Sequence, residues 1–401
     1  MKTTLRLLIA AFVLSLMPVT HVAAQGKIES PLERKARQER EAAAKKKRDQ
    51  NAREKKKREQ EEAARQRREQ EEAAAKERLA LVQQNKTKFH EGLALYKDEY
   101  DCIGFIDQTG KLIIPCRWKA AYAFYEGMCA VQDYNDKWGF IDKTGQLTIS
   151  CRFDGARSFH EGMASVRNNT SQKSGYIDKT GQLVVPFRWK SADYFHEGLA
   201  IVQETNNKYG YIDKTGKIIS PCKWTKASDF CEGMAMVTEA GKKGFIDKTG
   251  KLVIPCQWAE ASHFSEGLAW CKDNNGKYGF IDKTGKTAIP FTWKWAHNIF
   301  CESVAGVQDD NGKWGFIDLT GKVVIPCKWI SAGMFHEGLA SVKDDKGKYG
   351  FIDHSGALVI PCEWKDCYQF GTFQEGLCRV EDENGNLYNI DHTGKVIGLV
   401  P

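Results

Sequence analysis

Four histidines recur in the run Phe-His-Glu-Gly, and a histidine beside a carboxylate could act as a general base or bind a metal ion. They are His90, His160, His196 and His336. A catalytic site is normally one asymmetric cluster, whereas residues copied from unit to unit usually serve the unit itself. We therefore predict no catalytic residue. A hydrolase built on these His and Glu side chains is the weakest of three functional hypotheses, because it would need groups from different units to converge.

Thirteen cysteines could provide thiol or metal chemistry. Six of them occupy one repeated place, which Phe187 and Phe291 fill in two other copies: Cys116, Cys151, Cys222, Cys256, Cys327 and Cys362. A place that accepts Cys or Phe is typical of an apolar core rather than of a disulfide ladder. No pair has Cys-x-x-Cys spacing, so neither a structural zinc site nor a thioredoxin-like motif is indicated. We expect no bound metal and no cofactor.

These residues belong to a unit of about 35 residues that returns nine times from about residue 87 onward. Two markers define it, a Glu-Gly step and the motif Asp-x-(Thr or Ser)-Gly. In the copy from Glu266 to Trp293, three short strands joined by two turns fit the sequence. The second turn, Asp282 to Gly285, has the residues of a type I turn followed by a left-handed glycine. Between units, the spacing of Trp258, Ala261 and Phe264 predicts one helical turn.

The combined motif (Trp or Tyr)-Gly-(Phe or Tyr)-Ile-Asp-x-Thr-Gly, followed by a hydrophobic strand with Ile-Pro, resembles the WG-repeat family, also called the KWG or WG β-repeat. The resemblance covers residues 87–401. Trp138-Gly139 and Trp314-Gly315 match the naming dipeptide, and Ile103, Ser174 and Lys243 depart from it. The family has no defining catalytic residues, so the resemblance implies interaction rather than chemistry.

Tryptophans at two repeated places are the candidate interaction or structural positions. They are Trp118, Trp138, Trp189, Trp224, Trp258, Trp293, Trp314, Trp329 and Trp364. Most of them follow the third strand, where such a column is more often core than binding surface. If one side of the column were exposed, its flat rings would suit stacking on sugar rings.

The N-terminal part has a different composition. Lys2 and Arg6, an apolar run from Leu7 to Val19 and the small residues before Gln25 have the layout of a secretory signal peptide, which we expect at residues 1–24. Residues 25–86 form a charged spacer rich in Ala, Glu, Lys and Arg. Opposite charges four residues apart support a long helix, but a heptad seam is missing, which argues against a stable coiled coil. A partly disordered, solvated tail is the alternative reading of this composition.

The net charge of +7 lies almost entirely outside the repeats. Residues 27–82 hold 19 basic and 13 acidic side chains, whereas residues 83–401 hold 38 and 39. A basic nucleic-acid-binding face on the repeats therefore has no support, and we expect no nucleic-acid partner.

We therefore predict an all-β tandem-repeat array over residues 87–401, of about nine three-stranded units, preceded by a long charged α-helix. An open superhelical stack is favoured over a β-propeller, because propellers usually have four to eight blades of four strands.

The predicted function is that of an exported, non-enzymatic scaffold, periplasmic or extracellular, that binds a protein partner in the cell envelope. No transmembrane span is expected after signal cleavage. The alternative is a module that binds glycan or cell wall through the repeated aromatic side chains.

Overall fold

The computed structural model describes residues 30–83, 88–297, 299–368 and 371–400. The chain divides into two compact units, Met1–Glu72 and Ala73–Pro401. The predicted signal peptide, residues 1–24, lies outside the described residues, as do residues 25–29 and 84–87 of the predicted spacer.

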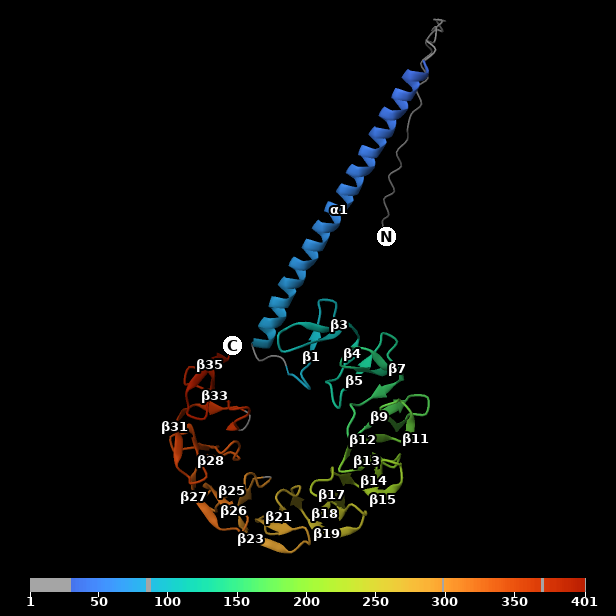
Figure 1. Cartoon of the computed structure of the whole chain (residues 1–401). Helices are drawn as coiled ribbons and strands as arrows, with labels where there is room; N and C mark the ends of the chain where they lie inside the picture. The colour runs from blue at the N-terminus through green and yellow to red at the C-terminus, as the bar shows by residue number, and fades with distance from the viewer. Residues whose placement is uncertain (1–29, 84–87, 298, 369–370, 401) are drawn as a thin grey trace, which may run out of the picture. The chain divides into compact units, whose positions relative to one another are not determined.

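The predicted spacer helix is present as α1, Pro31–Gln83, drawn in blue in Figure 1. It begins with a capping box: the Ser30 hydroxyl accepts the Glu33 amide N–H, and the Glu33 carboxylate accepts the Ser30 amide N–H at 2.9 Å. Pro31 at the first helical position needs no hydrogen-bond acceptor. The helix is exposed over most of its length. Ion pairs four residues apart line it, such as Arg65 with Glu69 at 2.8 Å.

Nine small antiparallel sheets follow in chain order within the described residues, coloured from cyan to red in Figure 1. Each contains the three strands expected from the sequence. The first strands are β1 Ala94–Lys97, β5 Met128–Gln132, β9 Met163–Asn168, β13 Leu199–Gln203, β17 Met234–Glu239, β21 Leu268–Lys272, β25 Val304–Gln308, β29 Ala340–Lys343 and β33 Cys378–Glu381. The second strands are β2 Ile103–Ile106, β6 Trp138–Asp142, β10 Lys173–Asp178, β14 Tyr209–Asp213, β18 Lys242–Asp247, β22 Tyr278–Asp282, β26 Trp314–Asp318, β30 Tyr349–Ile352 and β34 Leu387–Ile390. The third strands are β3 Leu112–Trp118, β7 Leu147–Phe153, β11 Leu183–Trp189, β15 Ile218–Trp224, β19 Leu252–Trp258, β23 Thr287–Trp293, β27 Val323–Trp329, β31 Leu358–Trp364 and β35 Val396–Val400.

The helical turn predicted between units is wrong. A short leading strand stands there and gives each sheet except the first a fourth strand: β4 Ala120–Ala121, β8 Gly155–Ala156, β12 Ser191–His196, β16 Lys226–Ala227, β20 Glu260–Ala261, β24 Trp295–Ala296, β28 Ser331–Ala332 and β32 Asp366–Cys367. Glu260 and Ala261 pair with Lys272 and Cys271 of the next first strand. That strand presents an open edge, and pairing with it satisfies backbone groups that a single helical turn would leave without partners.

The Asp-x-Thr-Gly turns form as predicted. The Asp282 carboxylate accepts the Thr284 amide and hydroxyl and the Lys286 amide at 2.6–3.0 Å. Gly285 follows with a φ of +86°, the left-handed conformation that glycine adopts without a steric cost. Each turn therefore joins the second strand of a sheet to the third.

The hydrophobic core lies between successive sheets rather than inside one. Phe140 and Ile149 of one sheet pack with Phe159, Val166 and Ile177 of the next. In the eight units after the first, the Phe ahead of the Glu-Gly step, or of Glu302-Ser303 in the seventh unit, packs at 4.8–5.2 Å against a Phe or Tyr in the second strand of the preceding sheet. Each unit thus buries its apolar side chains against its neighbours, as tandem-repeat proteins do.

The predicted fold class is confirmed: over the residues that the structure describes, an all-β array of nine small sheets, none of them closed on itself, follows one long helix. Within the described residues, no helix is both long and apolar enough to cross a membrane.

Candidate functional site

The Trp-Gly dipeptide has a structural explanation in the pairing of the second and third strands. Trp138 pairs with Phe153 and Phe140 with Ile149, so β7 carries two more residues than β6 over this interval. The extra residues arch over Gly139. A Cβ at Gly139 would lie 2.5 Å from the Ile149 carbonyl oxygen and 2.7 Å from the Cys151 amide nitrogen. Only glycine fits beneath this bulge.

The predicted tryptophan column after the third strands lies in or against the core. Trp118, Trp189, Trp224 and Trp364 are buried, and Trp258, Trp293 and Trp329 are half-buried. Trp138 and Trp314, in second strands, are half-buried and stack on Tyr122 and His297 at 5.1 and 4.5 Å.

Trp295, at the start of β24, is the exposed tryptophan among the eleven, all of which the structure describes. Trp295 was not among the predicted positions, because it lies outside both repeated aromatic places. Its exposure follows from its place in a leading strand, which was not predicted from the sequence.

The Glu-Gly step forms a tight turn with an unusual conformation at its glutamate. Glu161 and Gly162 have φ values of +51° and +82°, and His160 and Met163 exchange both backbone hydrogen bonds across them. Two left-handed residues in succession form a type I′ turn, for which Asn-Gly is the usual sequence. A glutamate in this conformation costs about 1–3 kcal/mol. The same φ of about +50° recurs at the glutamate of all nine steps.

At most of these glutamates, a contact with the next unit accompanies the strained conformation. The Glu161 carboxylate accepts the Gly198 amide N–H at 2.9 Å and lies 3.1 Å from the Lys214 ammonium. Gly198 and Lys214 belong to the tight turn and the Asp-x-Thr-Gly turn of the following unit. We call this arrangement the glutamate clamp. Complete clamps join Glu91 to Gly127 and Lys143, Glu126 to Gly162 and Lys179, Glu161 to Gly198 and Lys214, Glu197 to Gly233 and Lys248, and Glu232 to Gly267 and Lys283.

The later clamps differ from these five. His354 and His392 replace the lysine opposite Glu302 and Glu337, at 2.9 and 3.2 Å. Glu266 accepts the Ser303 amide at 3.1 Å, but Leu319 stands at the lysine position, and within the described residues no ion pair joins Glu266 to a basic group. The contact between the sixth and seventh units is therefore the least complete one.

The clamps keep their carboxylates ionised. The hydrogen bond from Lys143 is the largest cause that holds the pKa of Glu91 below its usual range, and the Gly127 amide adds to it against an opposing effect of burial. At Glu126, burial raises the pKa, but the bonds from Gly162 and Lys179 together outweigh it, and the pKa is lowered. Both carboxylates serve as anions in a fixed contact.

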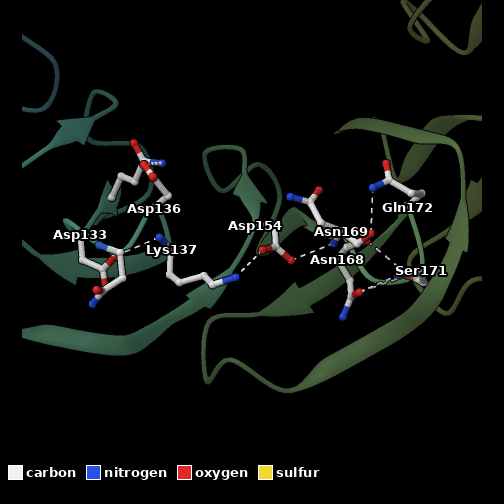
Figure 2. Close-up of polar contacts among 10 residues, drawn as sticks. Asp133, Asp136, Lys137, Asp154, Asn168, Asn169, Ser171 and Gln172 are labelled. Carbon is white, nitrogen blue, oxygen red and sulfur yellow. Dashed lines mark hydrogen bonds and ion pairs between the residues drawn. The ribbon is translucent and has the colours of Figure 1, made fainter.

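A second set of contacts also joins neighbouring units, and Figure 2 shows one example. The Lys137 ammonium, which precedes the Trp-Gly step of the second unit, pairs with the Asp154 carboxylate of the third. The other carboxylate oxygen of Asp154 accepts a hydrogen bond from the backbone N–H of Asn169 at 2.8 Å. Lysines in equivalent places pair with acids one unit further on, as Lys277 does with Asp310 and Lys313 with Asp345.

The repeated histidines are placed along the array and not around one centre. His160 lies between Tyr125 and Tyr194, with ring centroids 5.3 and 4.2 Å away, and 6.0 Å from His196. Burial, followed by the neighbouring His196, lowers the pKa of His160. His196 Nε2 lies 3.6 Å from Asp229, whose own pKa is raised by burial. Within the described residues, no group of three or more His, Cys, Asp or Glu side chains is arranged to hold a metal ion.

All thirteen cysteines lie within the described residues and are free thiols. The six at the repeated third-strand place are half-buried, and Cys151 and Cys222 are among those that pack against core clusters. These contacts agree with the prediction that the repeated cysteine place is an apolar core position, although the cysteine side chains are only half-buried. Elsewhere burial is deeper, and it raises the pKa of Cys129 to about 12.

One column of side chains varies between units while its backbone is nearly the same. It consists of the residue after the second residue of each leading strand, which is Ala in seven units and Cys367 in the last. We call it the variable column: Tyr122, Arg157, Asp193, Ser228, Ser262, His297, Gly333 and Tyr368. In seven of the eight units, the amide N–H of this residue donates to a carbonyl of the next strand at 2.8–3.0 Å. The backbone is thus fixed, and the side chains carry the differences between units.

The comparisons with known proteins agree with the repeat. The family model "WG containing repeat" matches eight stretches: 103–138, 138–169, 175–209, 209–242, 244–278, 278–314, 314–349 and 349–386. No curated protein matches the sequence.

Among solved structures, the chain is similar to "the eukaryotic initiation factor", with 14% identity, a TM-score of 0.44 and coverage of 76% of this chain and 94% of that one. It is also similar to the computationally designed Ika8 protein, with 12% identity, a TM-score of 0.35 and coverage of 67% and 95%. BamB from Moraxella catarrhalis has 12% identity, a TM-score of 0.31 and coverage of 67% and 92%. Because the family model covers most of residues 103–386, the chain belongs to the family of proteins with the WG containing repeat.

Proposed function

We propose that the protein is an exported, non-enzymatic scaffold whose repeat array binds a protein partner in the cell envelope. The observation that carries the proposal is the division of labour within each unit. The repeated Glu, Gly, Lys and aromatic residues hold neighbouring units together, whereas the variable column holds six residue types over its eight places on a nearly constant backbone, with Tyr122, Arg157 and Tyr368 exposed. Tandem-repeat proteins recognise partners through extended surfaces of this kind.

The experiment that tests the proposal compares two forms of the full mature chain in recovering an envelope protein. One is the wild type and the other carries Tyr122→Ser, Arg157→Ser and Tyr368→Ser, which change the three exposed members of the column. Each replacement is serine, which stands at this place in two other units as Ser228 and Ser262, so we expect the backbone to be unchanged. Lys46→Gln on the exposed helix serves as a control.

A specific partner that binds the wild type and the Lys46→Gln variant, and binds the column variant at least tenfold more weakly, supports the proposal. Equal binding to all three forms, or no partner in stoichiometric amount, contradicts it.

Export is tested on the same protein. We expect the chain recovered from the periplasm or the medium to begin at Gln25, after cleavage behind Ala24. Intact-mass measurement of the secreted chain gives the N-terminus directly, and a full-length mass in the cytoplasmic fraction alone would contradict export.

Glycan binding is the second candidate, and its support is narrower. Of the nine repeated tryptophans, four are buried and five are half-buried, whereas Trp295 is 48% exposed and lies 5.1 Å from the Tyr278 ring. If a soluble glycan binds, Trp295→Ala should abolish binding and Trp189→Phe, in the core, should not.

A further inference from the structure

The third unit lacks the aromatic side chain that gives the repeat its name. The pairing register establishes the equivalence: Trp138 pairs with Gln132 and Phe153, and Ser174 pairs with Arg167 and Trp189 in the same way. Ser174 therefore stands where the second unit has a tryptophan. The residue opposite Arg167 in the leading strand is also small, Gly155.

A cavity of about 340 Å³ lies at this place, within the usual size range of ligand pockets. Its lining comes from the second, third and fourth units and includes Tyr122, Arg157, Arg167, Ser174, Ser191 and Tyr194. The first unit also has a cavity where the aromatic side chain is missing. Ile103 stands at the aromatic place and lines a cavity of about 410 Å³ together with Lys97 and Ala121. In both units, a small or aliphatic residue at the aromatic place coincides with a cavity beside a basic residue.

The neighbouring unit indicates which shape the space accepts. In the second unit, the Trp138 ring fills the equivalent place and stacks on Tyr122 at 5.1 Å, with 17° between the ring planes. In the third unit that ring is missing, while the ring of Tyr194 and the guanidinium of Arg157, 5.3 Å apart, remain at the border of the cavity. A planar aromatic ring from a ligand would find stacking partners here.

The charges at the cavity indicate a second feature of the ligand. Arg157 is paired with the Asp193 carboxylate at 2.9 Å. Arg167 donates to the amide oxygen of Gln172 at 2.8 Å. Among the described residues, no carboxylate forms an ion pair with Arg167. The hydroxyls of Ser174 and Ser191 line the same space. A guanidinium without a carboxylate partner, beside hydroxyl groups, suits a carboxylate ligand.

We infer that the cavity at Ser174 binds a planar aromatic ring that carries a carboxylate. Two sources have this chemistry, a free aromatic acid and the C-terminal aromatic residue of a protein. The inference does not require the proposed scaffold function, because the cavity is formed by the array itself.

Isothermal titration calorimetry of the full chain with indole-3-acetate and with neutral indole-3-acetamide tests the inference. Ser174→Trp fills the cavity with the residue that the second unit holds, and we expect it to weaken indole-3-acetate binding at least tenfold. Arg167→Gln copies Gln132, and we expect it to weaken indole-3-acetate at least fivefold and the acetamide less than twofold. Thermal melting checks that each variant folds, and if Ser174→Trp does not fold, Arg167→Gln alone decides.

A peptide ending in Trp and its C-terminal amide distinguish the two sources. Tighter binding of the free-acid peptide than of indole-3-acetate assigns the site to a protein C-terminus, and the reverse order assigns it to a small aromatic acid. The inference is overturned if the wild type binds none of these probes at millimolar concentration, or if a folded Ser174→Trp variant binds indole-3-acetate as tightly as the wild type.

Discussion

At the scale of single residues, the repeat is maintained by side chains that make polar contacts and by glycines where the fold leaves no room for a Cβ atom. Gly139 lies beneath a bulge whose backbone leaves no room for a Cβ. Glu161 adopts a left-handed conformation, and its carboxylate makes two contacts with the next unit. The Asp282 carboxylate, which could look like a catalytic group, organises its own turn. Chemistry-bearing residue types therefore serve the architecture.

Gly139→Ala should lower the free energy of unfolding by about 1–3 kcal/mol, the usual range for overpacking. The matched control is Gly398→Ala in the last strand, where a Cβ would meet no atom within 4 Å. We expect the control to change stability by less than about 0.5 kcal/mol. Urea unfolding followed by circular dichroism measures both, and equal midpoints for the two variants would disprove the steric account of the dipeptide.

At the scale of the elements, the sequence predicted the strands well and the junctions poorly. Three strands joined by two turns were predicted between Glu266 and Trp293, and β21, β22 and β23 occupy this interval. The short strand β20 was missed because its pairing with β21 depends on an open edge and not on its own sequence. The glutamate clamp was missed because its partners are distant in sequence: Gly198 and Lys214 lie 37 and 53 residues from Glu161. The preference for Glu over Asn before a left-handed Gly was the available signal.

The incomplete clamp at Glu266 predicts a local weak point. Amide hydrogens in β25, Val304–Gln308, should exchange faster than those in β17, Met234–Glu239, which follows a complete clamp. Hydrogen exchange followed by mass spectrometry compares the two peptides in one sample.

The variant Leu319→Lys with Ser303→Gly restores the lysine and the glycine, and should slow exchange in β25 severalfold without changing β17. Unchanged exchange in β25 would show that the clamp does not control the stability of this junction.

At the scale of the whole chain, ionised carboxylates contribute at many junctions, so stability should depend on pH. The pKa values of Glu91, Glu126, Glu161, Glu197 and Glu232 are all lowered in the folded protein. A lowered pKa means that the unfolded chain binds protons first as the pH falls. The contribution is therefore complete above the unfolded value of about 4.3 and is lost as the pH falls through the folded values.

His297 adds an earlier step in the same direction. Burial lowers its pKa, so the unfolded chain gains a proton there below about pH 6.5 while the folded chain does not. We expect the urea midpoint, measured from pH 7.5 to pH 3, to decrease slightly once the pH is below 6.5. It should decrease steeply once the pH is below about 4.5. A constant midpoint across this range would be inconsistent with the assigned contacts.

The central claim is that the repeated glutamate serves the next unit and not its own, and a pair of matched substitutions tests it most directly. Glu161 and Glu375 occupy the same turn with φ values of +51° and +52°, but among the described residues the carboxylate of Glu375, in the ninth unit, accepts no hydrogen bond and joins no ion pair. Hydrogen bonds to charged groups contribute about 1.5–3 kcal/mol, and the Glu161 and Lys214 side chains remain 34% and 42% exposed, which reduces the contribution.

We therefore predict that Glu161→Ala lowers the free energy of unfolding by about 1 kcal/mol more than Glu375→Ala does. In a chain that already carries Lys214→Ala, this difference should be about half as large. Equal effects of Glu161→Ala and Glu375→Ala in urea unfolding would contradict the account.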